Sequence, residues 1–293
     1  MPVTKPESIL RFEDVTLEFS GKPALHKTNL EVHEGETFVL FGAAGSGKTV
    51  LLKLAMGLLQ PTSGRVYLLG NDISRMKETE LFNIRAEVGI LFQEGGLFDS
   101  LTIAENVSYP LHNQKALRIA EDLIDQRVRE SLEFVELGHT LEKFPSELSG
   151  GMRRRVGIAR ASVTNPKLLL YDSPTAGLDP ITAYTIMSLI IRQRDMRKTT
   201  TVLASHRYQD GSMAANFVWD DNKKDVVRAA PPDKFADLRT TFLIMNEGHI
   251  AFRGTQEQLE ASSDPYVSQF VLKQVAPVPF SNLPATRHIQ ADQ

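Results

Sequence analysis

The chain has 293 residues, of which 42% are hydrophobic and 24% are charged, with a net charge of -3 and no cysteine. This length can bury one large core or two lobes with separate cores, the lack of cysteine excludes disulfides and thiol chemistry, and the small negative charge argues against a dedicated nucleic-acid binder. No segment reaches the 18 consecutive apolar residues of a membrane-spanning helix and residues 1–6 lack the apolar core of a signal peptide, so we expect a cytoplasmic protein whose membrane role would come through a partner.

Short runs of alternating apolar and polar residues open the chain. Residues 10–19 (LRFEDVTLEF) and 37–41 (TFVLF) have the period of two that is typical of strands, and residues 20–23 form a turn sequence. After Thr49 the apolar spacing becomes helical, and residues 64–70 return to a strand pattern. This order of strand, loop, helix and strand predicts an α/β nucleotide-binding core.

The middle of the chain is predicted to be mostly helical. It contains few β-branched runs, and its apolar residues recur at helical spacing at Leu123, Val128, Leu132, Val135 and Leu137. We therefore assign residues 93–163 to a separate helical lobe. Residues 1–92 and 164–260 are assigned to a catalytic lobe.

Strand patterns resume in the last third of the chain, at residues 167–171 and 200–204. Between residues 216 and 241 a polar run, DDNKKD, lies between two apolar pairs, which predicts an inserted hairpin. Residues 261–293 are assigned to a C-terminal extension. From residue 276 it has turn-forming prolines and no periodicity, so we expect a mobile tail.

Residues 42–49 read GAAGSGKT and match the phosphate-binding pattern G-x-x-x-x-G-K-[ST] between a predicted strand and a predicted helix. The backbone N–H groups of such a loop converge on phosphates, and the helix N-terminus adds partial positive charge. The nucleotide-binding residues expected here are Gly42, Ala43, Ala44, Gly45, Ser46, Gly47, Lys48 and Thr49. Lys48 would reach the β- and γ-phosphates, and the Thr49 hydroxyl would bind Mg²⁺. An incidental glycine-rich turn is the alternative, with a chance probability of roughly 1%.

A second anion-binding pattern follows about a hundred residues later. Residues 148–152 read LSGGM and precede an arginine-rich helix. Ser149 and the amides of Gly150 and Gly151 would present donors at the helix N-terminus. A simple helix cap would explain Ser149, but it would not explain two phosphate-binding helix starts in one chain.

Together the two motifs resemble the P-loop and the signature motif of ATP-binding-cassette (ABC) ATPases, and the resemblance runs from about residue 9 to residue 260. It implies an α/β P-loop NTPase core with an antiparallel β subdomain and a helical subdomain. It also implies a head-to-tail dimer, most simply of two copies of this chain, in which the signature of one subunit faces the P-loop of the other. The expected cofactors are ATP and Mg²⁺.

Further positions fall in the order of that family. The resemblance implies that Phe19 stacks on adenine, although one aromatic on an alternating strand also fits core packing. Gln93 matches the Q-loop glutamine, which contacts Mg²⁺ and water and links the two lobes. Asp172 ends the apolar run LLLYD and matches the Walker B aspartate, which holds Mg²⁺. Residues 176–179, which end at Asp179, match the D-loop at the dimer seam, and His206 matches the switch histidine near the γ-phosphate. Alone, Gln93 would be an ordinary surface glutamine, and His206 would be a polar cap at the end of a strand.

One position departs from the family. The residue after the Walker B aspartate is normally a glutamate that acts as general base toward the attacking water, and here it is Ser173. A serine hydroxyl is too weak a base to take that proton, so we expect slow hydrolysis. Three interpretations remain open. In the first, His206, Gln93 and Mg²⁺ position the attacking water well enough for slow hydrolysis. In the second, the site is degenerate and serves as a nucleotide-gated clamp or works beside a competent partner subunit. In the third, Glu94 replaces the missing general base, which is disfavoured because its side chain should point away from that of Gln93 in extended backbone.

Residues 94–111, 152–155 and 178–182 resemble the ATPases of bacterial lipid transporters of the mammalian-cell-entry (MCE) type, and residues 263–270 resemble the C-terminal region of that group. This resemblance implies phospholipid transport. It also implies peripheral attachment to the cytoplasmic face of the inner membrane through an integral-membrane permease, with an MCE-type lipid-binding protein in the complex. ABC ATPases that act on ribosomes or DNA usually carry two cassettes or a long coiled coil, and this chain has one P-loop and no sustained heptads, so no nucleic-acid partner is expected.

Two features leave alternatives open. Four apolar residues follow the Q-loop, where the family docks a short helix of its permease, and they could equally form the core of the lobe: Leu97, Phe98, Leu101 and Tyr109. The segment 207–241 is longer than the family usually has before the next strand, and we expect this insertion to decorate the core or to contact a partner.

Overall fold

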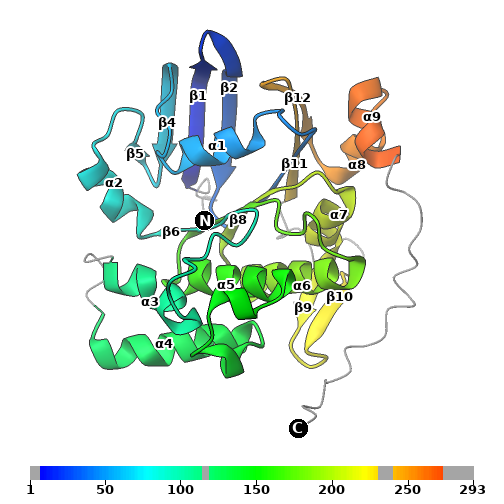
Figure 1. Ribbon diagram of the computed structural model, residues 1–293. Coiled ribbons are helices and arrows are strands. Elements are labelled where there is room, and N and C mark those ends of the chain that lie inside the picture. Colours follow the sequence, from blue (N-terminus) through cyan, green and yellow to red (C-terminus); the bar gives the residue numbers. More distant parts are fainter. Residues whose placement is uncertain (1–6, 114–118, 230–239, 273–293) are drawn as a thin grey trace, which may run out of the picture.

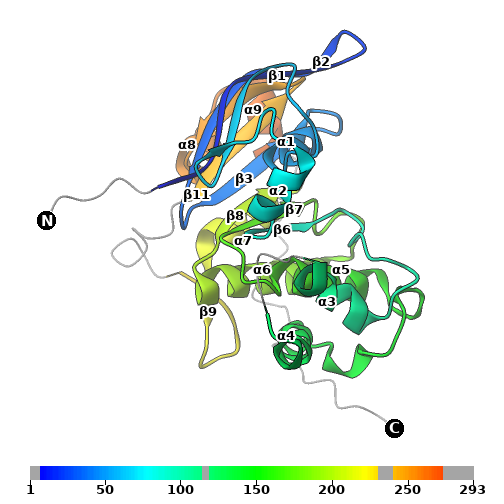
Figure 2. The same ribbon diagram turned by 90° about the vertical axis from the view of Figure 1, so that its left-hand side faces the viewer.

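The computed structural model describes residues 7–113, 119–229 and 240–272 (Figure 1). Two β-sheets form the upper part of the molecule in this view, and a layer of helices lies below them (Figures 1 and 2). Within these residues no helix is both long enough and apolar enough to span a membrane.

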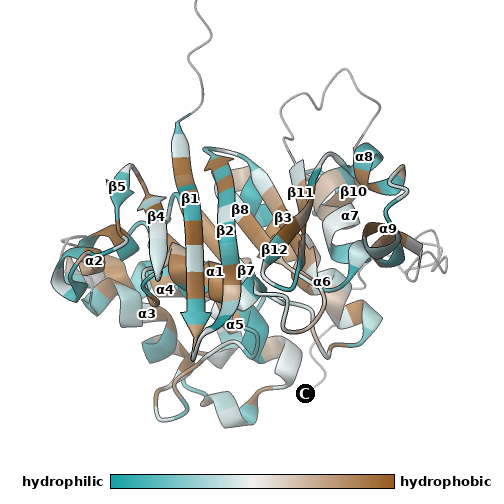
Figure 3. Ribbon diagram, turned by 90° about the horizontal axis from the view of Figure 1, so that it is seen from above, coloured by the Kyte–Doolittle hydropathy of each residue, from teal (hydrophilic) through white to brown (hydrophobic). Residues whose placement is uncertain are grey.

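The first sheet is antiparallel and has the strand order β2-β1-β4-β5. Its strands are β1 (Ser8–Phe19), β2 (Lys22–His33), β4 (Ser63–Leu68) and β5 (Asn71–Asp72). Phe19 pairs with Lys22, and the two residues between them, Ser20 and Gly21, have φ angles of 50° and 76°. Two consecutive positive φ angles are typical of the tight hairpin turns that match the twist of the strands. Figure 3 shows the alternation of apolar and polar residues along β1.

The second sheet has six strands in the order β12-β11-β3-β8-β7-β6, parallel except for β12. The strands are β3 (Thr37–Gly42), β6 (Val88–Leu91), β7 (Leu168–Asp172), β8 (Thr200–Ala204), β11 (Thr240–Asn246) and β12 (His249–Gly254). Every residue of β3, β7 and β8 is buried, as expected for parallel strands covered on both faces. Alternate residues therefore face two different cores: Phe38 and Leu40 join one cluster, and Val39 and Phe41 join the other.

Helices cover both faces of this central sheet. α1 (Lys48–Ala55) contacts strands of both sheets, and its buried leucines join the core between them. The opposite core is covered by α5 (Gly150–Ser162), α6 (Pro180–Arg197) and α7 (Tyr208–Asn216). The remaining helices are α2 (Glu78–Arg85), α3 (Ile103–Asn113), α4 (Glu121–Phe134), η2 (Gly138–Thr140), η3 (Pro145–Glu147), α8 (Gln256–Glu260) and α9 (Pro265–Leu272). α3 and α4 pack on α5, so the residues around the second motif belong to a helical layer (Figure 2).

One detail of the predicted helical pattern is wrong. Leu123 is 45% exposed, and its neighbour Ile124 is buried instead. Ile124, Val128 and Leu132 recur every four residues along α4, so they share the face that packs inward. Leu123 lies one position out of that phase.

The segment after His206 contains a hairpin that packs on α6. β9 (Phe217–Asp220) pairs antiparallel with β10 (Asp225–Arg228), so a hairpin lies within the range 216–241 where one was predicted. Residues 230–239 of that range lie outside the described residues. The predicted tail from residue 276 lies outside them too. Arg192 on α6 places its guanidinium 4.3 Å from the Phe134 ring centroid and 4.7 Å from that of Trp219. The Trp219 amide donates to Asp195 on the same helix at 2.8 Å. The hairpin is thus fastened to α6 and, through Arg192, to the end of α4.

Tyr171, on β7 of the central sheet, provides a stability test. It is fully buried, and among the described residues its hydroxyl has no hydrogen-bond partner. Burial raises the pKa of Tyr171 well above its ordinary value. Because an unsatisfied buried hydroxyl costs about 1–3 kcal/mol, we expect Tyr171→Phe to raise the free energy of unfolding by about 1 kcal/mol. Urea unfolding measures this. Tyr184→Phe is the control, because that hydroxyl donates to Asp225, and a loss of stability in Tyr171→Phe would contradict the expectation.

Candidate nucleotide-binding site

The loop between β3 and α1 is held tightly against its surroundings. Gly42 and Gly47 have φ angles of 155° and 107°. A Cβ atom at Gly42 would lie 2.7 Å from the carbonyl oxygen of Met245, and one at Gly47 would lie 2.8 Å from that of Ala24. Neither position can take a side chain without moving the backbone of β11 or β2. The glycines of the pattern are therefore required by this fold as well as by a phosphate.

Lys48 brings a positive charge into this loop. Its Nζ donates to the carbonyl oxygens of Gly42 at 2.7 Å and Ala43 at 2.9 Å. Burial lowers the pKa of Lys48, and the charge of Asp172 acts in the opposite direction. The N-cap of α1 is Gly47, which offers no side-chain cap, and no acid lies in the first turn. The N–H groups of that turn and the lysine together favour an anion at this place.

Thr49 and Asp172 meet beside the loop. The Thr49 hydroxyl donates to Oδ2 of Asp172 at 2.8 Å, although the two residues are 123 positions apart. Asp172 is buried at the end of β7. A hydroxyl and a carboxylate are hard oxygen ligands of the kind that Mg²⁺ prefers, and it usually keeps several waters and phosphate oxygens besides. This pair of oxygen ligands fits that mode.

The other predicted residues follow neighbouring strands. β3, β6, β7 and β8 are parallel, so the loops after them emerge at the same edge of the sheet. The P-loop follows β3, Gln93 follows β6, Ser173 follows β7 and His206 follows β8. Ser173 has a φ of 50°, and its hydroxyl donates to Oδ1 of Asp172 at 3.2 Å. The sheet topology thus gathers these candidates beside the P-loop.

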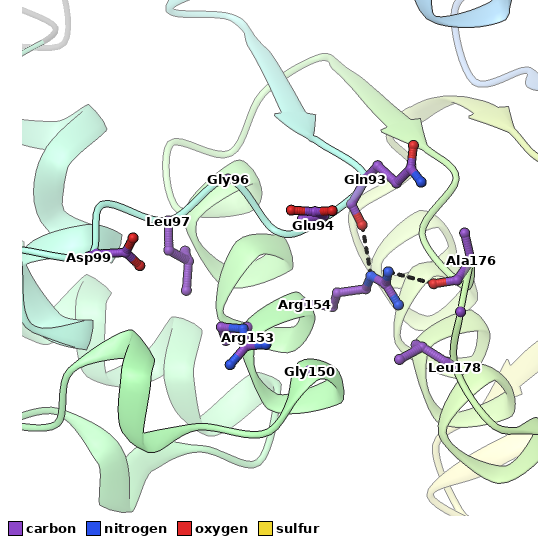
Figure 4. Close-up of a pocket in the computed structure, with 11 residues that line it drawn as sticks. Gln93, Glu94, Gly96, Leu97, Asp99, Gly150, Arg153, Arg154, Ala176 and Leu178 are labelled. Atoms are coloured by element: carbon purple, nitrogen blue, oxygen red, sulfur yellow. Dashed lines mark hydrogen bonds between the residues drawn. The ribbon is translucent and has the colours of Figure 1, made fainter. Parts of the chain in front are cut away.

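A cleft of about 640 Å³ opens between the Q-loop, the start of α5 and residues 176–178 (Figure 4). Arg154 spans it: its Nε donates to the carbonyl oxygen of Gln93 at 2.9 Å and its Nη2 to that of Ala176 at 2.5 Å. Burial lowers the pKa of Arg154, and the nearby Glu94 carboxylate acts in the opposite direction. The Glu94 side chain points away from that of Gln93 (Figure 4). Sequence reasoning noted only an arginine-rich helix here and did not predict this link between the Q-loop and the D-loop.

The second motif and the D-loop form helix caps. The Ser149 hydroxyl accepts a hydrogen bond from the Met152 amide at 3.2 Å and caps α5. Asp179 caps α6, and hydrogen bonds from the Thr182 hydroxyl and amide lower its pKa. The roles of Ser149, Gly150, Gly151 and Asp179 toward a nucleotide on a second subunit stay predictions.

Phe19 is 50% exposed at the end of β1, so core packing is not its role.

The fold and this site define an α/β P-loop cassette whose candidate phosphate-binding loop lies at the carboxyl edge of its central sheet. Residues 25–176 match the family model described as "ABC transporter". The dimeric, post-hydrolysis structure of the ATP-binding cassette MJ0796 bound to ADP and Pi superposes with a TM-score of 0.69 at 27% identity, covering 84% of this chain and 98% of that one. The chain belongs to the ABC transporter family and is an ABC-type ATPase, which confirms the predicted fold class and family.

Two curated relatives differ in how much of them the chain covers. The methionine import ATP-binding protein MetN of Bifidobacterium longum is 39% identical over 208 residues, which are 69% of this chain and 51% of MetN. The chain thus spans about half the length of that relative. The intermembrane phospholipid transport system ATP-binding protein MlaF of Haemophilus influenzae is 32% identical over 265 residues, which are 90% of each chain. This second match supports the resemblance to lipid-transport ATPases.

Proposed function

We propose that the chain is the ATP-binding subunit of a transporter that uses ATP to move phospholipid across or between bacterial membranes. The observation that carries this proposal is the match to MlaF over 90% of each chain. The identity to MetN is higher, but it covers only 51% of that protein. Methionine import is therefore the second candidate.

The proposed nucleotide site uses residues on one sheet edge. The amides of residues 42–49 and Lys48 would hold the phosphates, and Phe19 would stack on adenine. Thr49, Asp172 and Gln93 would hold Mg²⁺, which when bound neutralises charge on the β- and γ-phosphate oxygens. His206 and Gln93 would orient the attacking water. Ser149, Gly150, Gly151 and Asp179 would complete the site across a dimer of two copies of the chain.

The proposed permease contact lies on the helical layer beyond the Q-loop. Phe98 and Tyr109 are each 42% exposed, with ring centroids 4.7 Å apart, and the guanidinium of Arg160 lies 5.7 Å from the Phe98 ring. Leu97 instead packs against the core. An exposed aromatic pair is a typical anchor for a partner helix. Through this contact the chain would sit on the cytoplasmic face of the inner membrane, in a complex that includes an MCE-type lipid-binding protein.

A double substitution, Phe98→Ala with Tyr109→Ala, is expected to abolish co-purification with the permease while nucleotide affinity stays within about two-fold, because hot-spot aromatics carry about 2 kcal/mol or more each. Affinity-tagged pull-down from detergent extracts measures the first quantity, and equilibrium binding of a fluorescent ATP analogue measures the second. Phe144→Ala is the matched control, since Phe144 is also 42% exposed on the helical layer. Equal retention of the permease by the double variant and the control would count against this docking surface.

The transported substrate can be tested on the intact complex. We expect lipid extraction of the purified complex to yield bound phospholipid, and ATP turnover of the reconstituted complex to rise with phospholipid but not with methionine. If methionine raised ATP turnover and phospholipid did not, methionine import would replace phospholipid transport as the proposed function.

Ser173 favours one further alternative, in which ATP binding alone closes the dimer as a clamp or in which the site is the degenerate half of a heterodimer. Turnover measured with and without the permease separates such a clamp from a motor.

A further inference from the structure

Asp210 is a buried carboxylate on α7 that the predicted site does not include. The residue is 2% exposed, and two buried hydroxyl groups donate to the same oxygen, Oδ2. The Thr175 hydroxyl lies 2.5 Å from it and the Ser205 hydroxyl lies 2.6 Å from it. Hydrogen bonds to a charged carboxylate are about twice as strong as neutral ones. Asp210 therefore holds both hydroxyls firmly.

The two hydroxyls belong to two different loops of the nucleotide site. Thr175 lies two residues after Ser173, in the loop that follows β7. Ser205 directly precedes His206, in the loop that follows β8. Because β7 and β8 are neighbouring parallel strands, these loops leave the sheet side by side, and one carboxylate can fasten both.

The backbone of both loops is tied down around this carboxylate. The Ser173 amide donates to the carbonyl oxygen of Ala204 at 2.8 Å, which joins the first loop to β8. The Arg207 amide donates to the Ser205 hydroxyl at 3.0 Å, so the hydroxyl that binds Asp210 also sets the start of α7. A shift of Asp210 would thus be transmitted to both sides of the site.

Stability alone does not explain a carboxylate here. Burial raises the pKa of Asp210, with the two hydroxyl hydrogen bonds acting in the opposite direction. Nε of Arg207 is 3.9 Å from Oδ1, which is beyond hydrogen-bond distance. Removing a charge from water is costly, and a neutral asparagine would cost less. An acid in the first turn of α7 also complements the helix dipole, but that role does not need the two hydroxyls.

We propose that Asp210 is a positioning residue for ATP hydrolysis, which fixes the loop carrying Ser173 relative to the loop carrying His206. This inference rests on the proposed roles of Ser173 and His206. Positioning supplies most of the catalysis in phosphoryl transfer, and a misplacement of about 1 Å can cost about 10²-fold. Because residue 173 is not a glutamate, catalysis depends more strongly on the exact positions of the other groups that orient the attacking water.

Steady-state ATPase assays on Asp210→Asn are expected to show a kcat about 10-fold below that of the parent chain, with the KM for MgATP changed less than two-fold. The double variant Thr175→Val with Ser205→Ala should give a similar loss of kcat, and adding Asp210→Asn to it should cost little more, because the three groups act as a unit. Ser212→Ala, on the same helix, is the control and should leave kcat unchanged. Equal kcat in the parent chain and Asp210→Asn would overturn the proposal.

Amide hydrogen exchange tests the same link without relying on turnover. In Asp210→Asn we expect exchange about 10-fold faster at residues 173–178 and 205–207 together, with the strands of the sheet unchanged. Faster exchange confined to α7, or a lower melting temperature with both loops unaffected, would show a merely structural role. If the parent chain has no ATP turnover, the proposed use of ATP fails, and the exchange data still decide whether Asp210 couples the two loops.

Discussion

Replacing Ser173 with glutamate is expected to raise kcat for ATP hydrolysis about 10²-fold, the lower end of what a general base typically contributes. The Ser173 side chain lies beside the proposed Mg²⁺ ligand, since its hydroxyl is 3.2 Å from Oδ1 of Asp172, and its amide donates to the carbonyl oxygen of Ala204. Serine, which has a Cβ atom as glutamate does, already adopts a φ of 50° at this position, so the substitution should add little backbone strain. A carboxylate there would extend further toward the water that a short hydroxyl cannot deprotonate.

The control for this substitution is Ser173→Gln, which has nearly the shape of glutamate but cannot accept the proton. It should show no gain over the parent chain. Phosphate release under saturating MgATP measures all three proteins, with and without the permease. An unchanged kcat in Ser173→Glu would contradict the hypothesis that Ser173 limits hydrolysis. It would favour the clamp or the degenerate half of a heterodimer.

Lys48→Ala is expected to lower kcat for ATP hydrolysis about 10²- to 10³-fold, which is the typical cost of one preorganised donor to developing charge. The Lys48 ammonium lies inside the loop, on the carbonyl oxygens of Gly42 and Ala43, and no acid in the first turn of α1 opposes an anion there. ATP affinity should fall with kcat, because the lysine contacts the phosphates in the bound state as well.

Lys53→Ala is the matched control, since Lys53 lies on the same helix and is exposed. Its turnover and its affinity for a fluorescent ATP analogue should equal those of the parent chain. A Lys48→Ala protein that still binds and hydrolyses ATP normally would contradict the assignment of residues 42–49 as the phosphate site.

Local sequence determined much of this protein, because a P-loop, an apolar strand ending in a carboxylate and a signature helix are each contiguous patterns. The chemistry of residues 42–49 depends on backbone that one short segment supplies, and the turn at Ser20 and Gly21 likewise depends on its own φ angles. The position of Asp172 at the end of β7 follows from an apolar run, since a strand buried on both faces is apolar throughout.

The tertiary structure decided which of these segments contact one another. The contact of Thr49 with Asp172 joins residues 123 positions apart. Arg154 links the loops after β6 and β7 by binding carbonyl oxygens, which every residue has, and Asp210 binds hydroxyls from the loops after β7 and β8. No period or motif marks such partners, because they are set by the order of strands in the sheet. The phase of α4, with Ile124 inward and Leu123 outward, was likewise settled by packing against the neighbouring helices.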